Sequence, residues 1–326
     1  MVSRRRNRYT NNRIQPLTTP LSVTKQDLSS VVNSTRVLGD LEFDPVSMAI
    51  SGDYIVVGGQ RAELAVGRLS EPGNLTVVRS GGSINNFDSV TNLNITGEHD
   101  VPRLLVCNND HSVRLLALPN LDLLTELRFP TAVNYAAISP DGTKMCVVGD
   151  SNEVFLFHKR GDTFEKIATL IASNDASFSC DWSQNSKQFA VGSQDGYATV
   201  WDIRSQQKMV QLETFQHGRS RGACRNVKFS PSGSVDLLAF SEHTGYVNIV
   251  DTREFARRQV LSVAILGSQT VGVENASPEA GMHDLQITGM RFAADSSALF
   301  VGLEQSILEY TVDQVGRHSF ASSALI

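Results

Sequence analysis

The stretch 189–204 (Phe-Ala-Val-Gly-Ser-Gln-Asp-Gly-Tyr-Ala-Thr-Val-Trp-Asp-Ile-Arg) constrains the fold of this chain most strongly. An apolar run ending at Gly192 predicts one strand, and 197–203, rich in aromatic and β-branched residues, predicts another. Between them, Gln-Asp-Gly predicts a tight turn, because Asp accepts backbone hydrogen bonds and Gly tolerates positive φ. The second strand is apolar on both faces around Trp201, which indicates that it is covered on both sides.

The same three-strand pattern recurs along the chain. The turn sequences Ser-Pro-Asp-Gly at 139–142 and Ser-Pro-Ser-Gly at 230–233 introduce two further copies, and weaker copies lie at 48–69, 93–118 and 290–312. The small residue that ends each middle strand recurs at steps of 50, 41, 43, 49 and 61 residues, at Gly58, Asn108, Gly149, Gly192, Ser241 and Gly302. A constant unit with variable connections predicts repeats of about 40–45 residues, each packed against its neighbours.

An Asp-Gly turn followed by a strand that ends in Trp-Asp resembles the WD-repeat family, whose repeats are blades of a β-propeller. The resemblance implies an all-β propeller with six recognisable units, and the sequence leaves six and seven blades open. It also implies that a strand at 36–43 completes the blade at the other end of the chain and closes the ring. We expect one propeller domain over 34–326 with a polar insertion at 267–281, after a polar, basic and disordered tail at 1–33.

In WD-repeat proteins a His, the turn Asp and the strand Trp form a buried hydrogen-bonded network. The resemblance carries structural roles over to Asp195, Trp201, Asp110 and His283. No unit is complete: the fourth lacks its His, and the sixth has Tyr310 in place of Trp. We expect structural rather than catalytic roles for these residues, because buried polar groups need hydrogen-bond partners.

The segment 180–260 resembles a narrower group of fungal WD-repeat proteins, through Cys-Asp-Trp-Ser, Gly-Ser-Gln-Asp-Gly and Asp-Leu-Leu-Ala-Phe-Ser-Glu-His. One branch of that group includes substrate receptors of the GID (CTLH-type) ubiquitin ligase. The resemblance therefore implies a protein-binding scaffold or adaptor, and its most specific form is a substrate receptor of a ubiquitin ligase complex.

Charge and composition limit the classes of function. The 326 residues carry a net charge of −5, and the first 13 hold five arginines and no acid, so the rest of the chain is acidic. An acidic body argues against a nucleic-acid groove, which leaves the basic tail or the loop 216–225 as the nucleic-acid alternative. Four cysteines without a C-x-x-C pair, and no apolar signal segment or membrane span, predict an intracellular protein, cytoplasmic, nuclear or both.

Catalytic patterns are missing from the sequence. It contains no G-x-S-x-G elbow, no H-E-x-x-H and no Walker A loop, and its seven histidines show no metal-ligand spacing. We therefore expect no enzyme activity, no cofactor and no metal site. The alternative is a hydrolase on a propeller scaffold, which would need clustered carboxylates at the central channel, where we expect one acid, Glu242.

The residues expected to contact a partner ring the central channel of the implied propeller. They precede the turn Asp or open the innermost strands, at Asn109, Ser151, Gln194, Glu242, Arg225, Asn226, Asn134, Tyr135 and Phe178. Hydrogen-bonding groups with a few aromatic rings suit an extended peptide, so we expect a protein or peptide partner, whose identity the sequence does not name. We expect Glu242 at the surface, paired with an ammonium or Arg group of that partner.

Overall fold

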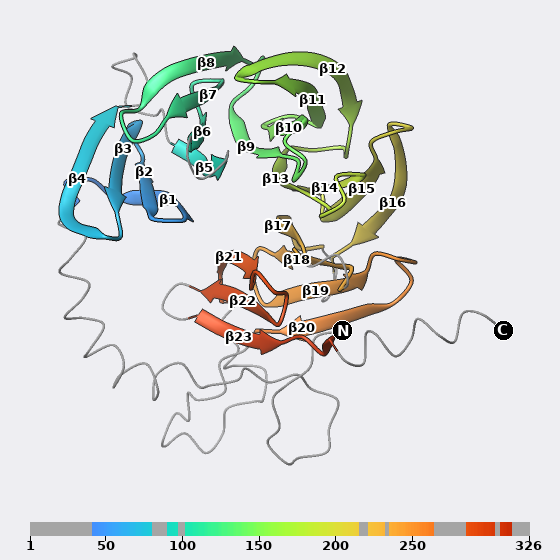
Figure 1. The fold of residues 1–326 in the computed structure, drawn as a ribbon. Coiled ribbons are helices and arrows are strands. Elements are labelled where there is room, and N and C mark those ends of the chain that lie inside the picture. Colours follow the sequence, from blue (N-terminus) through green and yellow to red (C-terminus); the bar gives the residue numbers. More distant parts are fainter. Residues whose placement is uncertain are drawn as a thin grey trace, which may run out of the picture.

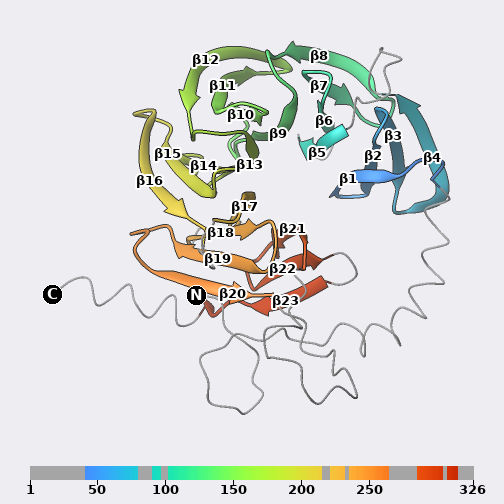
Figure 2. The same ribbon diagram turned by 180° about the vertical axis from the view of Figure 1, so that it is seen from behind.

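Six antiparallel sheets follow one another around a central axis in the computed structural model (Figures 1 and 2). The structure describes residues 41–79, 90–96, 102–214, 221–231, 235–263, 285–303 and 307–314. All 23 regular elements there are β-strands, and every sheet uses strands that are consecutive in the chain. Each sheet is therefore one blade, and the predicted all-β propeller with six units is confirmed.

Blades 1 to 3 run from an inner strand at the channel to an outer strand at the rim (Figure 1). Blade 1 comprises β1 (Pro45–Ser51), β2 (Tyr54–Gly59), β3 (Glu63–Arg68) and β4 (Glu71–Arg79). Blade 2 comprises β5 (Val90–Thr96), β6 (Arg103–Asn108), β7 (Ser112–Ala117) and β8 (Asp122–Arg128). Blade 3 comprises β9 (Val133–Ile138), β10 (Lys144–Gly149), β11 (Glu153–Arg160) and β12 (Thr163–Ile171).

Blades 4 to 6 continue the ring in the same strand order. Blade 4 comprises β13 (Ser177–Trp182), β14 (Gln188–Ser193), β15 (Tyr197–Asp202) and β16 (Gln207–Glu213). Blade 5 comprises β17 (Cys224–Phe229), β18 (Leu237–Glu242), β19 (Tyr246–Asp251) and β20 (Arg258–Ser262). Blade 6 comprises β21 (Ile287–Phe292), β22 (Ala298–Leu303) and β23 (Ile307–Thr311).

Apolar side chains between the blade faces hold the ring together. Side chains alternate between the two faces along a strand, so in β10 Met145 and Val147 pack toward blade 2 while Cys146 and Val148 pack toward blade 4. The middle strands are accordingly apolar on both faces. Five core clusters fill the five interfaces between successive blades, from blades 1 and 2 to blades 5 and 6.

Every inner strand carries a β-bulge at its second residue. In each blade the pairing register with the next strand skips one residue, at Val46, Thr91, Asn134, Phe178, Arg225 and Thr288. An extra residue bends the strand and redirects side chains away from the regular alternation. The bulges lie where the inner strands begin, which places three residues of the predicted partner-binding set, Asn134, Phe178 and Arg225, at equivalent positions.

Blade 4 contains the Trp that the sequence analysis selected. Trp201 is 5% exposed and packs in the core between blades 3 and 4, stacked on Phe189 with ring centroids 6.1 Å apart. The predicted burial of Trp201 against a neighbouring blade is confirmed. A second tryptophan, Trp182, donates a hydrogen bond from Nε1 to the carbonyl oxygen of Ala137 across the same interface, at 2.9 Å, which the repeat pattern did not predict.

Several expectations about the termini and the insertion fall outside the described residues. The closing strand predicted at 36–43 is described only over 41–43, where the chain forms bends instead of a strand. The tail 1–33, the insertion 267–281 and His283 lie outside the described residues. In the described part of the chain, blade 6 has three strands whereas the other blades have four.

Replacing Trp201 with Ala should lower the free energy of unfolding by about 3–5 kcal/mol, because it removes a large side chain and leaves a cavity between two blades. Urea unfolding followed by circular dichroism measures the loss. The matched control is Met209→Ala on the outer strand β16, where the side chain is 45% exposed and the loss should stay within about 0.5 kcal/mol. Equal losses in the two variants would contradict the packing of Trp201.

Tyr310 gives a test of burial in blade 6. Its side chain is 1% exposed, its hydroxyl has no hydrogen-bond partner among the described residues, and burial raises its pKa to about 12. The unfolded chain loses this proton near pH 10, so the free energy of unfolding should fall by up to about 2–3 kcal/mol between pH 10 and 12. Tyr310→Phe lacks the hydroxyl, so the fall in the free energy of unfolding that this group causes should be absent in the variant. Urea unfolding at a series of pH values measures the difference. Identical pH profiles of the two proteins would contradict a buried, unpartnered hydroxyl.

Candidate functional site

The predicted partner-binding residues come together at one end of the central channel. In each blade the second strand ends beside the start of the inner strand, as Ser177 pairs with Ser193 in blade 4. The first residues of the inner strands and the turns after the second strands therefore meet at the same end. We call this end the channel mouth.

A cation–π contact at the channel mouth joins blades 4 and 5. Arg225 of β17 holds its guanidinium over the ring of Phe178 of β13, with Cζ 3.8 Å from the ring centroid. Its Nε is buried without a hydrogen-bond partner, and burial lowers the pKa of Arg225. An arginine nevertheless remains protonated at any physiological pH. The mouth thus holds a partly desolvated cation that no acid among the described residues pairs with.

The asparagines at the start of the inner strands bind neighbouring protein groups. Asn134 donates from Nδ2 to Oδ1 of Asp150 at 2.8 Å and to the carbonyl oxygen of Ser177, in blade 4, at 3.1 Å. Asn226 donates from Nδ2 to the hydroxyl of Ser241 at 3.0 Å. These amides brace the mouth, and each keeps its carbonyl oxygen as an acceptor for a ligand.

The turn residues differ in how accessible they are. Gln194 is exposed, and only its backbone is engaged, through a hydrogen bond from its N–H to the carbonyl oxygen of Ala176 at 2.8 Å. Asn109 and Ser151 are half-buried, and the Ser151 hydroxyl accepts the N–H of Glu153 at 3.2 Å. Among these turn residues, Gln194 is therefore the most accessible to a partner.

Tyr135 belongs to a cluster that spans the channel. Its hydroxyl accepts a hydrogen bond from Nζ of Lys228 at 2.7 Å, which joins blade 3 to blade 5. Nζ of Lys228 also lies 3.9 Å from Oδ1 of Asp181 in blade 4. Burial raises the pKa of Asp181, although Lys228 and the N–H of Phe229, at 2.7 Å, oppose that rise. The sequence analysis missed Lys228 and Asp181. The available signal was a charged residue between two apolar residues of an inner strand, as in Val227-Lys228-Phe229.

Glu242 is not at the surface, so that expectation was wrong. Its side chain is 4% exposed and accepts a hydrogen bond from Nδ2 of Asn248 at 3.4 Å. Gly222 lies over the carboxylate, so closely that a Cβ at this glycine would come within 2.7 Å of Oε2. Asn248 in turn accepts from Nε of Arg258 at 3.1 Å. Glu242 therefore belongs to a buried polar chain within blade 5 and does not offer its carboxylate to a partner.

Two predicted structural acids have partners that the repeat pattern did not name. Asp195 accepts the backbone N–H of Asn174 at 3.0 Å, from the loop that enters blade 4 instead of its own turn. Asp110 accepts hydrogen bonds from the hydroxyl of Ser112 and the guanidinium of Arg114, which is 5% exposed. Burial raises the pKa of Asp110, but the hydrogen bonds from Arg114 and Ser112 outweigh burial and hold this pKa below its usual value.

The inner strands are more cationic than the protein as a whole. Their charged side chains are Asp181, Arg225, Lys228 and Arg291. Lys228 is offset by Asp181, whereas Arg225 has no ion pair among the described residues and Arg291 is exposed. The channel wall therefore carries excess positive charge inside an acidic protein.

The structure adds two negative observations about the described residues. They include no group of three His, Cys, Asp or Glu side chains that could hold a metal ion. They also form no helix with the length and hydropathy needed to cross a membrane.

Fold and repeat pattern together define a WD-repeat β-propeller. A family profile described as "WD domain, G-beta repeat" matches residues 164–202, the stretch from the outer strand of blade 3 through β15 of blade 4. A second profile, described as "Uncharacterised protein domain (DUF2415)", matches residues 222–262, which form blade 5. WD-repeat propellers typically serve as protein-interaction scaffolds, and the profile match suggests that broad class of function for this chain.

Relatives of the chain include yeast proteins and animal WD-repeat proteins. "Uncharacterized protein C4G3.03" of Schizosaccharomyces pombe is 29% identical over 290 residues, which cover 88% of this chain and 79% of the relative. "Uncharacterized protein YLR149C" of Saccharomyces cerevisiae is 28% identical over 199 residues, 49% of this chain but 27% of the relative. "WD repeat-containing protein 1" of Xenopus tropicalis is 27% identical over 128 residues, 38% of this chain and 20% of the relative.

Lys228→Met should lower the free energy of unfolding by about 1.5–3 kcal/mol, because Asp181 loses its cation and Tyr135 loses a charged donor. Adding Asp181→Asn should recover part of this loss, since the amide oxygen still accepts the N–H of Phe229 without carrying charge. Urea unfolding of the wild type, both single variants and the double variant measures the coupling, with the exposed Lys187→Met as control. Strictly additive losses would contradict the cluster.

Proposed function

We propose that this WD-repeat propeller holds an extended, acidic segment of another protein at the channel mouth. The observation that carries the proposal is Arg225, a half-buried guanidinium stacked on Phe178 without an acid among the described residues. Leaving a cation partly desolvated and unpaired costs free energy, and a ligand carboxylate would offset that cost.

The geometry of Arg225 suits a carboxylate. Stacking on Phe178 engages the face of the guanidinium and leaves its N–H edge, which binds carboxylates through two parallel hydrogen bonds. The exposed side chain of Gln194 and the free carbonyl oxygen of Asn134 are positioned to bond the backbone of an extended peptide. Because Glu242 is buried, the mouth favours an acidic partner and not the ammonium or Arg group that the sequence analysis assigned to it.

A finer form of this function is a substrate receptor of a GID-type ubiquitin ligase. Its support is the resemblance of residues 180–260 to the fungal WD-repeat group, a stretch that contains most of blades 4 and 5, including Arg225. A receptor needs two surfaces, one for the substrate and one for the ligase. We therefore propose that Arg225 serves the substrate surface and that the ligase binds elsewhere on the propeller.

Two alternatives lose support from the described residues. A hydrolase needs clustered carboxylates or a metal in the channel, where Asp181 is already paired with Lys228. Nucleic-acid binding through 216–225 would use Arg221 and Arg225, but Arg221 pairs with Glu213 at 2.9 Å, which leaves Arg225 as the one arginine without an ion pair among the described residues of this loop. We also propose an intracellular site of action, because all four cysteines are free and buried.

Fluorescence polarisation of labelled peptide pools tests the proposal. Pools of short random peptides with one fixed Glu, one fixed Lys or one fixed Gln are titrated with the protein. The Glu pool should bind best, and Arg225→Leu should weaken its binding about 10- to 150-fold, as expected for a lost charged hydrogen bond of about 1.5–3 kcal/mol. Amidating the C-termini of the Glu pool removes the terminal carboxylate, so the binding that remains is due to the Glu side chain.

The matched control is Arg204→Leu, which removes an exposed arginine that follows β15 at the other end of blade 4. It should leave peptide binding unchanged, and both variants should melt within a few degrees of the wild type. Unchanged binding in a folded Arg225→Leu variant, or a preference for the Lys pool, would refute the proposal. If ligase subunits co-purify with wild type but are lost from Arg225→Leu, the separate ligase surface is wrong.

A further inference from the structure

The ring formed by the described residues has a gap on one side. Inner strands contact one another in succession from β1 to β21, and core clusters fill the interfaces between them, but no described cluster joins blade 6 to blade 1. Figures 1 and 2 show this gap between the β1–β4 sheet and the β21–β23 sheet from both sides. The two sheet faces that border the gap therefore have no neighbouring blade among the described residues.

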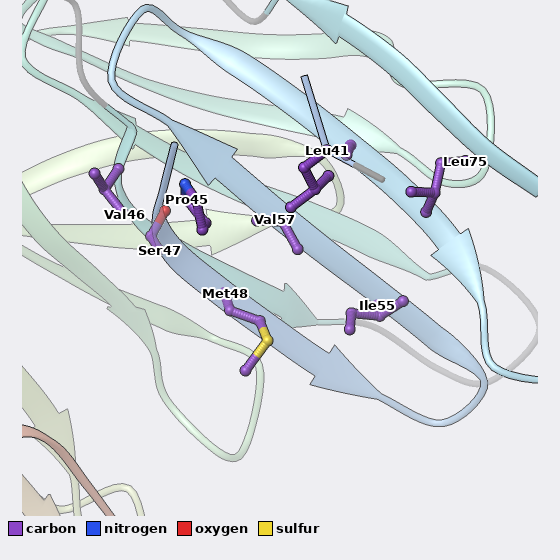
Figure 3. Close-up of a pocket in the computed structure, with 9 residues that line it drawn as sticks. Leu41, Pro45, Val46, Ser47, Met48, Ile55, Val57 and Leu75 are labelled. Carbon is purple, nitrogen blue, oxygen red and sulfur yellow. The ribbon is translucent and has the colours of Figure 1, made fainter. Parts of the chain in front are cut away.

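The face of blade 1 toward the gap is apolar. The side chains of this face alternate along the strands with those that pack on blade 2. Four of its large side chains are exposed: Val46 by 45%, Met48 by 63%, Ile50 by 40% and Val77 by 53%. A pocket of about 430 Å³ opens on this face, and its lining, shown in Figure 3, is almost entirely aliphatic. Contiguous apolar surface of this kind marks a contact site in a folded protein.

The opposing face of blade 6 is also incompletely covered. Phe300 is 37% exposed and Ile307 is 64% exposed. Leu299 and Val301 pack on blade 5, so Phe300 and Gly302, which alternate with them, lie on the opposite face. Ile307 pairs with Gly302 and therefore lies on that same face. The gap thus has apolar side chains on both of its walls.

The chain itself approaches the blade 1 face just before β1. Leu41 forms part of the pocket wall, close to Val57 in Figure 3. The ring of Phe43 lies so near Gly59 that a Cβ at this glycine would come within 2.6 Å of it. Residues 31–40 directly precede Leu41 and carry four aliphatic side chains, Val31, Val32, Val37 and Leu38.

We propose that residues 31–40 dock on the gap-facing side of blade 1 and fill its pocket with their aliphatic side chains. The segment thereby takes the position that the next blade would occupy beside β1–β4. Leu41 and Phe43 already lie on the face, so docking is intramolecular and has a high effective concentration, which favours it over a second copy. This inference is independent of the peptide site at the channel mouth and is tested without any peptide.

Thiol labelling measures whether the face is covered. The four native cysteines are 0% exposed, so a single Met48→Cys substitution introduces an accessible thiol into an unreactive background. Leu123→Cys on the outer strand β8, where the side chain is 55% exposed, is the matched control. In the full chain, the thiol at position 48 should react with a maleimide at least about ten-fold more slowly than the thiol at 123. Removing residues 1–40 should bring the two rates together.

A second variant guards against unfolding of the truncated protein. Val37→Asp with Leu38→Asp in the full chain should also accelerate labelling at position 48, because charges are excluded from an apolar pocket. Equal rates at 48 and 123 in the full chain would refute the proposal, as would an unchanged slow rate in the Asp variant. Protection that grows with protein concentration would assign the face to a second copy, and protection that appears only in cell extract would assign it to another protein.

Discussion

The packing of each blade against the next is the constraint on which the rest of this structure depends. A blade has two apolar faces and cannot bury either of them by itself, so the free energy of burial becomes available only when neighbours stack. The alternation in β10, with Met145 directed to one interface and Cys146 to the other, shows how a single strand serves two neighbours. Each blade that covers an apolar face of its neighbour brings a second apolar face of its own, which the following blade must cover.

The channel mouth is built from side chains that blade packing does not use. The bulge at the start of each inner strand releases one residue from the alternation, and at Arg225 and Phe178 the released residues meet across a blade boundary. Positive charge gathers on inner strands while the whole protein is acidic. This charge distribution is the physical basis of the proposed acidic partner, because a cation at the mouth attracts a carboxylate and an acidic surface repels it elsewhere.

The candidate site was predictable in position but not in chemistry. Gln194 and Arg225 recur at fixed places in the repeat, so local spacing was enough to assign them to one end of the channel. Glu242 is the last residue of β18 and pairs with Cys224 as Ser193 pairs with Ser177, one position before the place of Gln194. Gly222, 20 residues earlier in the chain, covers its carboxylate. Lys228 and Tyr135 are separated by 93 residues and still form one cluster, a contact that no local pattern encodes.

The sequence by itself determined the strands and turns of six repeats and left six and seven blades open. Strands and turns depend on residues close together in the chain, such as a Gly with positive φ at 196 or apolar residues on both faces of a strand. The tertiary structure decided which polar groups stay available to a partner and which sheet faces have no neighbouring blade among the described residues. Burial of Glu242, exposure of Met48 and the unpaired cation of Arg225 all depend on which segments meet across the ring. Desolvation and ion pairing are properties of those distant contacts, so they emerge only when the chain is folded.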